Sequence, residues 1–139
     1  MSYKIIGKYI KNLDFGVPDP KTFFLLSKDI SNYKINIDIK SNQIKEKIIE
    51  VETSLNLLPI KNDFKKINTK IIYSTIIELA DGLTDKTEIE KIILINVPSK
   101  IYPELRKIFI FIFENSGFKD VNINENVDFQ KLYDQKQVQ

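Results

Sequence analysis

The chain has 139 residues, of which 42% are hydrophobic and 29% are charged, and its formal net charge is +2. It contains no Cys and no His, which excludes disulfides, thiolate catalysis, most zinc sites and acid–base chemistry that depends on histidine. The weak net charge and the absence of a Lys/Arg run argue against a nucleic-acid-binding protein, for which a pI near 8.6 is the only support. A chain of this length can bury a core of its own, so we expect one domain over 1–139.

The N-terminal half of the chain has the alternating pattern of β-strands. β-Branched and aromatic residues recur with a period of two over 3–15, 33–40, 49–57 and 67–79. The predicted turn before the last of these strands contains Pro59 and 61–63. Short turns favour antiparallel pairing, so residues 1–80 are predicted to form an antiparallel sheet region.

The connection after the first predicted strand has an unusual composition. The two prolines within 16–20 remove ladder donors and end the strand. The following Phe23-Phe24-Leu25-Leu26 is predicted to lie in an irregular segment. Two interpretations of this segment stay open, namely a loop folded onto its own core and part of the wall of a hydrophobic groove.

The C-terminal half, over 84–135, is predicted to be helical. A short helix is expected over 88–95, capped by Asp85 or Thr87 and interrupted at 96–98. A long helix then begins at Ser99 or Pro103 and ends near 115–117, where glycine is a common terminator. A last short helix is expected over 127–135. Strands followed by helices indicate an α+β fold with the helices on one face of the sheet.

The long predicted helix contains six consecutive large apolar residues, Ile108-Phe109-Ile110-Phe111-Ile112-Phe113. A helix that is apolar all round must be covered on more than one side. Because a chain this short has little of its own with which to cover it, the segment predicts contact with a partner surface.

The sequence shows no motif for catalysis, phosphate binding or membrane insertion. No phosphate-binding loop is present among its 4 glycines, and Glu50 and Glu52 are interpreted as part of a solvated strand face. We therefore expect no enzyme, no metal and no cofactor. Lysines interrupt the apolar stretches at the N-terminus, and no apolar run approaches the roughly 20 residues of a membrane span, so we expect a cytoplasmic protein.

Several motifs near the two ends of the chain occur together in one known family. The C-terminal ones are Pro98, Ile101-Tyr102-Pro103, Arg106, Gly117-Phe118, Val127-Asp128-Phe129 and Leu132-Tyr133, and residues 11–18 are Lys-Asn-Leu-Asp-Phe-Gly-Val-Pro. With these motifs the sequence resembles the SecB family of bacterial protein-export chaperones over nearly its whole length.

The resemblance implies a SecB-like α+β fold, with a four-stranded antiparallel sheet and a long C-terminal helix packed on one face. It implies an ATP-independent cytosolic chaperone that binds unfolded precursor proteins in hydrophobic grooves and delivers them to the SecA motor. It also implies a homotetramer, assembled as a dimer of dimers largely through the long helices.

The resemblance also assigns roles to particular residues. The candidate client-binding residues are Phe15, Val17, Phe23, Phe24, Leu26, Ile101 and Tyr102. The candidate SecA-contact residues are Asp14, Glu50, Glu52 and Glu78, and the candidate oligomer-interface residues are Ile108, Phe109, Phe111 and Ile112. The chain departs from the family's acidic pattern at Asn12 and Gly16. This departure motivates an alternative, a SecB-like interaction module dedicated to one client without SecA delivery.

Overall fold

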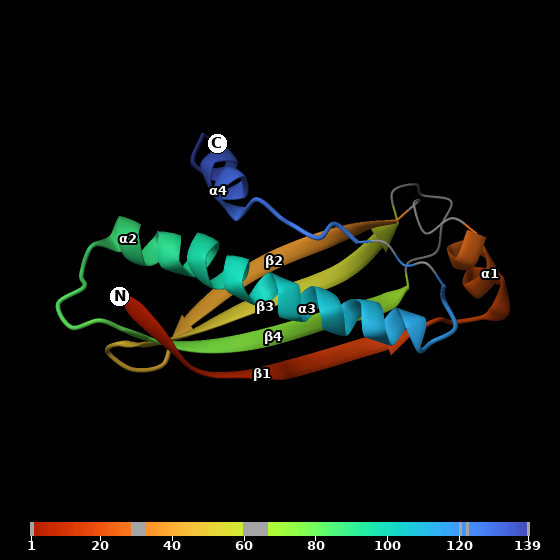
Figure 1. The fold of residues 1–139 in the computed structure, drawn as a ribbon, viewed down its shortest axis with the longest axis horizontal. Coiled ribbons are helices and arrows are strands. Elements are labelled where there is room, and N and C mark those ends of the chain that lie inside the picture. The colour runs from red at the N-terminus through yellow and green to blue at the C-terminus, as the bar shows by residue number, and fades with distance from the viewer. Residues whose placement is uncertain (1, 29–32, 60–66, 120, 122, 139) are drawn as a thin grey trace.

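The computed structural model describes residues 2–28, 33–59, 67–119, 121 and 123–138, and the predicted turn at 61–63 lies outside them. Four strands and a set of helices follow one another along the chain (Figure 1). In chain order they are β1 (Tyr3–Gly16), α1 (Pro20–Lys28), β2 (Tyr33–Gln43), β3 (Ile48–Pro59), β4 (Asn68–Leu79), α2 (Lys86–Lys91), the π-helical turn η2 (Ile92–Asn96), α3 (Val97–Glu114) and α4 (Phe129–Val138). The predicted α+β fold is confirmed.

The four strands form one antiparallel sheet in the order β1-β4-β3-β2, so β1 and β2 are its edges. The register of β1 on β4 shifts between Ile5 and Gly7 and again between Ile10 and Asn12. β2 continues three residues beyond its predicted end, because 41–43 remain paired with β3 despite their polar side chains. Backbone pairing with the neighbouring strand therefore sets this boundary, rather than the apolar alternation.

The core lies between one face of the sheet and α3, which crosses the strands diagonally (Figure 1). Odd-numbered residues of β3 and β4 point to this face, and Leu55 and Ile77 are completely buried there. The helix buries a stripe at a spacing of four residues, as expected for one face of an amphipathic helix. This stripe consists of Val97, Ile101, Leu105, Phe109 and Phe113. The prediction of a long helix on one face of the sheet is confirmed.

The predicted interruption at 96–98 is wrong, because α2, η2 and α3 form one continuous helix (Figure 1). Proline lacks an N–H group and its ring clashes with the carbonyl of residue i−4 in a regular helix. Here the π-helical turn precedes Pro98, and the Val97 N–H donates to the Ile92 carbonyl five residues back. The wider turn accommodates the proline in the first turn of α3. Of the two predicted caps, Asp85 is the one used, since its carboxylate accepts from the Thr87 N–H at 3.0 Å.

The prediction of an irregular segment around Phe23 is also wrong, because residues 20–28 form the helix α1. Asp19 caps this helix, since its Oδ1 accepts a hydrogen bond from the Thr22 N–H at 2.7 Å. Pro20 at the first helical position is compatible with this start, because its missing N–H would have no partner there. The cap and the proline decide the conformation locally, and the four apolar residues then divide between two faces of one helix.

The segment that follows α3 is held by residues of the C-terminal motifs. The Tyr102 hydroxyl donates to the Asn124 carbonyl at 2.6 Å, and Arg106 Nε donates to the Ile123 carbonyl at 3.1 Å. The rings of Tyr102 and Phe129 lie 6.1 Å apart, and Phe129 is buried. These motif residues therefore have a packing role, which is to fix the chain between α3 and α4.

Candidate functional site

A row of aromatic rings runs from the core to the surface at the end of the molecule where α1 meets the C-terminal end of α3. Phe113 is buried and packs edge-on against Phe15, with ring centroids 5.1 Å apart. Phe118 lies 5.4 Å from Phe113 and 4.9 Å from Phe23. Phe23 in turn lies 5.5 Å from Phe24, whose side chain is 67% exposed. We call these five residues the aromatic row, and its outer end is open to solvent.

Gly117 allows the Phe23 ring to pack close to the backbone at the end of α3. Its φ of +101° lies in the left-handed region, which residues with a side chain rarely adopt. A Cβ atom at this position would also lie 3.3 Å from Phe23 Cε2. Both the turn that ends α3 and the close approach of the Phe23 ring therefore require glycine here.

The outward face of α1 continues this apolar surface. Phe24 and Leu25 are exposed, whereas Thr22 and Leu26 point inward and are buried. The residues Lys21, Phe24, Leu25, Ser27 and Lys28 line a shallow hollow of about 510 Å³. A second hollow of about 300 Å³ lies between β2 and α4, and Ile37, Ile39, Leu94, Phe129, Leu132 and Tyr133 provide its apolar lining. The sequence does not indicate this second hollow, because the alternation in β2 does not show which helix packs against that strand.

The candidate client-binding residues divide between the surface and the core. The structure brings Phe15, Phe23 and Phe24 together in the aromatic row, and Val17 packs half-buried beside the core. It places the remaining three, Leu26, Ile101 and Tyr102, in the core with almost no accessible surface. Within residues 23–26, Leu26 therefore packs onto the core while Phe24 faces solvent.

Three of the four candidate oligomer-interface residues lie on the outer side of α3. Phe111 is 65% exposed, and Ile108 and Ile112 are half-buried. Ile112 and Leu13 of β1 line one small cavity, so this side of the helix adjoins the edge strand. Phe109 instead points into the core and is buried, which makes its assignment to an exposed interface wrong. The cause is the helical period, because Phe109 and Phe113 continue the buried stripe and Phe111 does not.

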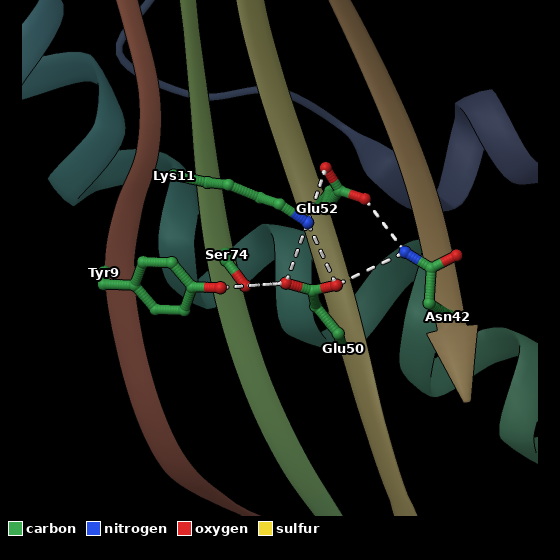
Figure 2. Close-up of polar contacts among 6 residues, drawn as sticks. All are labelled: Tyr9, Lys11, Asn42, Glu50, Glu52 and Ser74. Atoms are coloured by element: carbon green, nitrogen blue, oxygen red, sulfur yellow. Dashed lines mark hydrogen bonds and ion pairs between the residues drawn. The ribbon is translucent and has the colours of Figure 1, made fainter. Parts of the chain in front are cut away.

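A buried carboxylate joins all four strands on the sheet face opposite the helix (Figure 2). Glu50 of β3 accepts hydrogen bonds from side chains on the three other strands. The donors are Ser74 Oγ of β4 at 2.7 Å, Tyr9 OH and Lys11 Nζ of β1 at 3.1 and 3.3 Å, and Asn42 Nδ2 of β2 at 3.3 Å. The hydrogen bond from Ser74 contributes most to lowering the pKa of Glu50 from 4.5 to about 2, while burial opposes the shift.

The interpretation of Glu50 as part of a solvated strand face is therefore wrong, since the residue is 7% exposed. The donors lie on the sheet face opposite the helix, on strands that are distant in sequence. Only the register of the strands places them side by side around Glu50. In the sequence, each of the four strands has a polar residue on this face. These residues predict a shared hydrogen-bond network only when the pairing of the strands is known.

The four candidate SecA-contact residues all lie on this outer face, and three of them have partners there. Glu50 and Glu52 both lie close to Lys11, with N–O distances of 3.3 and 3.6 Å. Glu78 pairs with Lys4 at 3.1 Å. Asp14 is opposite Lys70 in the register of β1 and β4. Lysines thus accompany the acidic residues, and the face is not predominantly acidic at these positions.

The described residues show no cluster of three or more potential metal ligands. Among the helices in this part of the chain, none is both long enough and apolar enough to cross a membrane. The described residues present apolar surface at α1, at α3 with β1, and between β2 and α4.

Comparison with known proteins agrees with this architecture. The family model described as "Preprotein translocase subunit SecB" matches residues 1–139. The chain is 41% identical over 135 residues to the "Putative protein-export protein SecB" of Pelagibacter ubique, which covers 97% of this chain and 96% of that protein. It is 23% identical to the "Protein-export protein SecB" of Anaplasma phagocytophilum, over 96% of this chain and 91% of the relative.

A solved structure has a similar fold. The Mycobacterium tuberculosis SecB-like chaperone Rv1957, in complex with a ChAD peptide from the HigA1 antitoxin, superposes with a TM-score of 0.66. The match covers 91% of this chain and 88% of that one, at 10% sequence identity. At this identity the likeness concerns the fold alone.

Proposed function

The chain belongs to the SecB family, and on that premise we propose that it is an ATP-independent cytoplasmic chaperone that binds unfolded precursor proteins and delivers them to the SecA motor for export. The observation that carries the proposal is the aromatic row, which leads from the core to the exposed ring of Phe24. A holding chaperone needs no catalytic group or cofactor, because binding to the unfolded state is enough to shift the folding balance by mass action.

The shape of the apolar surfaces supports binding of extended chains. The hollow at α1 and the hollow between β2 and α4 are shallow and mostly apolar, so their apolar contacts discriminate weakly between one apolar side chain and another. Weak contacts along one unfolded client add through effective concentration. The antitoxin peptide bound by the Mycobacterium tuberculosis relative is a precedent for peptide binding on this fold.

Suppression of aggregation tests the chaperone proposal. We expect the protein, without ATP, to prevent light scattering by a chemically unfolded client that is diluted into buffer. Phe24→Ser removes an exposed ring whose burial is worth about 1.5–3 kcal/mol, so affinity for the client should fall at least about tenfold. Ile44→Ser is the matched control, because Ile44 is also exposed but lies in the turn between β2 and β3. Equal protection by wild type and Phe24→Ser, or no protection by wild type, would refute the proposal.

We further propose that a second copy of the chain covers the outer side of α3, within a homotetramer built as a dimer of dimers. Phe111 is exposed there, and Leu13 of the adjoining edge strand is 45% exposed. One aromatic ring and one aliphatic side chain are therefore available to a partner. Phe111→Asp introduces a charge into this surface and should reduce the mass measured by light scattering while circular dichroism stays unchanged. An unchanged mass would show that another face makes the assembly.

A second candidate function is an interaction module dedicated to one client, without delivery to SecA. The lysines beside Glu50, Glu52 and Glu78 favour it, because they reduce the negative charge that an acidic SecA-contact face would present. Titration of SecA against the purified protein distinguishes the two functions. Tight SecA binding, together with recovery of many unrelated precursors in a pull-down, would exclude the dedicated module.

A further inference from the structure

We propose that the outward face of α1 selects client segments in which two carboxylates bracket an apolar pair, an inference that rests on the chaperone function proposed above. The face consists of Lys21, Phe24, Leu25 and Lys28, which we call the α1 face. The occupant is an unfolded polypeptide segment of the order acidic, apolar, apolar, acidic. The substrate class follows from the spacing and the charge of these four residues.

The spacing of the α1 face matches such a segment. Its residues stand at positions i, i+3, i+4 and i+7, which lie in one row along a helix. With a rise of 1.5 Å per residue, Lys21 and Lys28 lie about 10.5 Å apart along the helix axis. In the polyproline II conformation, which is common in unfolded chains, a client advances about 3.1 Å per residue with three residues per turn. Carboxylates three positions apart then lie on one side of the client, about 9 Å from each other, and reach both lysines. The two apolar positions between them flank this side and contact Phe24 and Leu25.

The charge of the α1 face is of one sign. The helix Pro20–Lys28 contains lysines but no acidic residue. Both of its lysines are exposed, and no ion pair joins either of them to another residue in the described part of the chain. The carboxylate of Asp19 lies at the start of the helix, where it accepts the capping hydrogen bond. A client carboxylate would therefore meet ammonium groups at both ends of the apolar pair.

The surface around the exposed Phe111 has a different charge pattern. Phe111 on α3 has Lys107 four residues before it and Glu114 three residues after it, so its row contains both signs. This surface has no net preference for the charge of a partner segment. The contrast separates the α1 face, with its uniform charge, from the surface that we assign to a second copy.

Peptide binding measured by fluorescence anisotropy tests the inference. Three labelled peptides share a Phe-Leu pair in a neutral frame, and the pair is bracketed by glutamates, by serines or by lysines. At low salt we expect the glutamate peptide to bind about threefold to tenfold more tightly than the serine peptide, from two surface ion pairs. The lysine peptide should bind more weakly than both, and the differences should disappear near 1 M salt.

Charge reversal provides the matched comparison. The double variant Lys21→Glu, Lys28→Glu should invert the order of the glutamate and lysine peptides and leave the serine peptide unchanged. Lys34→Glu, Lys40→Glu on β2 changes the net charge equally and should preserve the wild-type order. If the serine peptide binds and all three wild-type affinities are equal, the charge preference is wrong while the chaperone function stands. If none of the peptides binds and unfolded clients still aggregate, the proposed function itself fails.

Discussion

Replacement of Glu50 by glutamine should destabilise the sheet strongly at neutral pH. The carboxylate accepts hydrogen bonds from side chains of the three other strands, and an amide cannot accept all of them. Its NH₂ group would instead face donors such as Ser74 Oγ and Lys11 Nζ. Ser74 is completely buried, so its hydroxyl cannot replace a lost acceptor with water, and this costs free energy. Because the other donors come from β1 and β2, the substitution acts on the whole sheet rather than on one strand pair.

The magnitude of this effect follows from the pKa of Glu50. Hydrogen bonding, chiefly from Ser74, lowers that pKa from 4.5 to about 2. At about 1.4 kcal/mol per pKa unit, ionisation of Glu50 in the folded state contributes about 3 kcal/mol to stability. The folded pKa is the lower one, so this contribution is complete above pH 5 and is lost as the pH falls toward 2.

Urea unfolding at fixed protein concentration, followed by circular dichroism from pH 7 to pH 2, measures the effect. We expect Glu50→Gln to lower the free energy of unfolding by about 3 kcal/mol at pH 7, with the gap to wild type narrowing below pH 5. Glu78→Gln is the matched control on the same sheet face, since its exposed ion pair with Lys4 contributes at most about 1 kcal/mol. Equal losses in the two variants, or a gap that does not change with pH, would refute this reasoning.

Three further substitutions test the packing around the candidate surfaces. Phe109→Ala should lower the free energy of unfolding by about 3–5 kcal/mol in urea titrations, because the ring is buried in the core; a loss below 1 kcal/mol would contradict its placement. Gly117→Ala should cost about 1–3 kcal/mol and weaken client binding, because alanine disfavours a φ of +101°; an unchanged melting temperature would contradict that. Tyr102→Phe should cost about 1 kcal/mol and speed amide exchange around Asn124, whose carbonyl loses its donor.

The strands and the long helix were predictable because their signals are local. Alternation with a period of two marked all four strands, and the end of α3 near Gly117 followed from the preference of glycine for positive φ. The errors occurred where one local signal opposed another. Pro98 predicted an interruption of the helix, but the π-helical turn before it keeps the helix continuous. The four apolar residues after Pro20 predicted an irregular segment, but the residues form a capped helix.

The candidate sites were less predictable, because the sequence shows which residues are apolar or charged but not what covers them. Ile101, Tyr102 and Phe109 were assigned to surfaces, yet the helical period turns them into the core. Phe24 and Phe111 have the same apolar character and remain exposed. Glu50 had the appearance of a solvated strand residue until the register placed donors from three strands around it.

The sequence by itself determined the α+β fold class and the family, because periodicity and motif spacing are properties of the chain alone. The tertiary structure decided which apolar residues are buried in the core and which stay exposed. It also decided which carboxylates, such as that of Glu50, accept hydrogen bonds from other strands. It placed two lysines and two apolar residues in one exposed row on α1. These depend on register and helix rotation, which are set by packing between segments that are distant in the sequence.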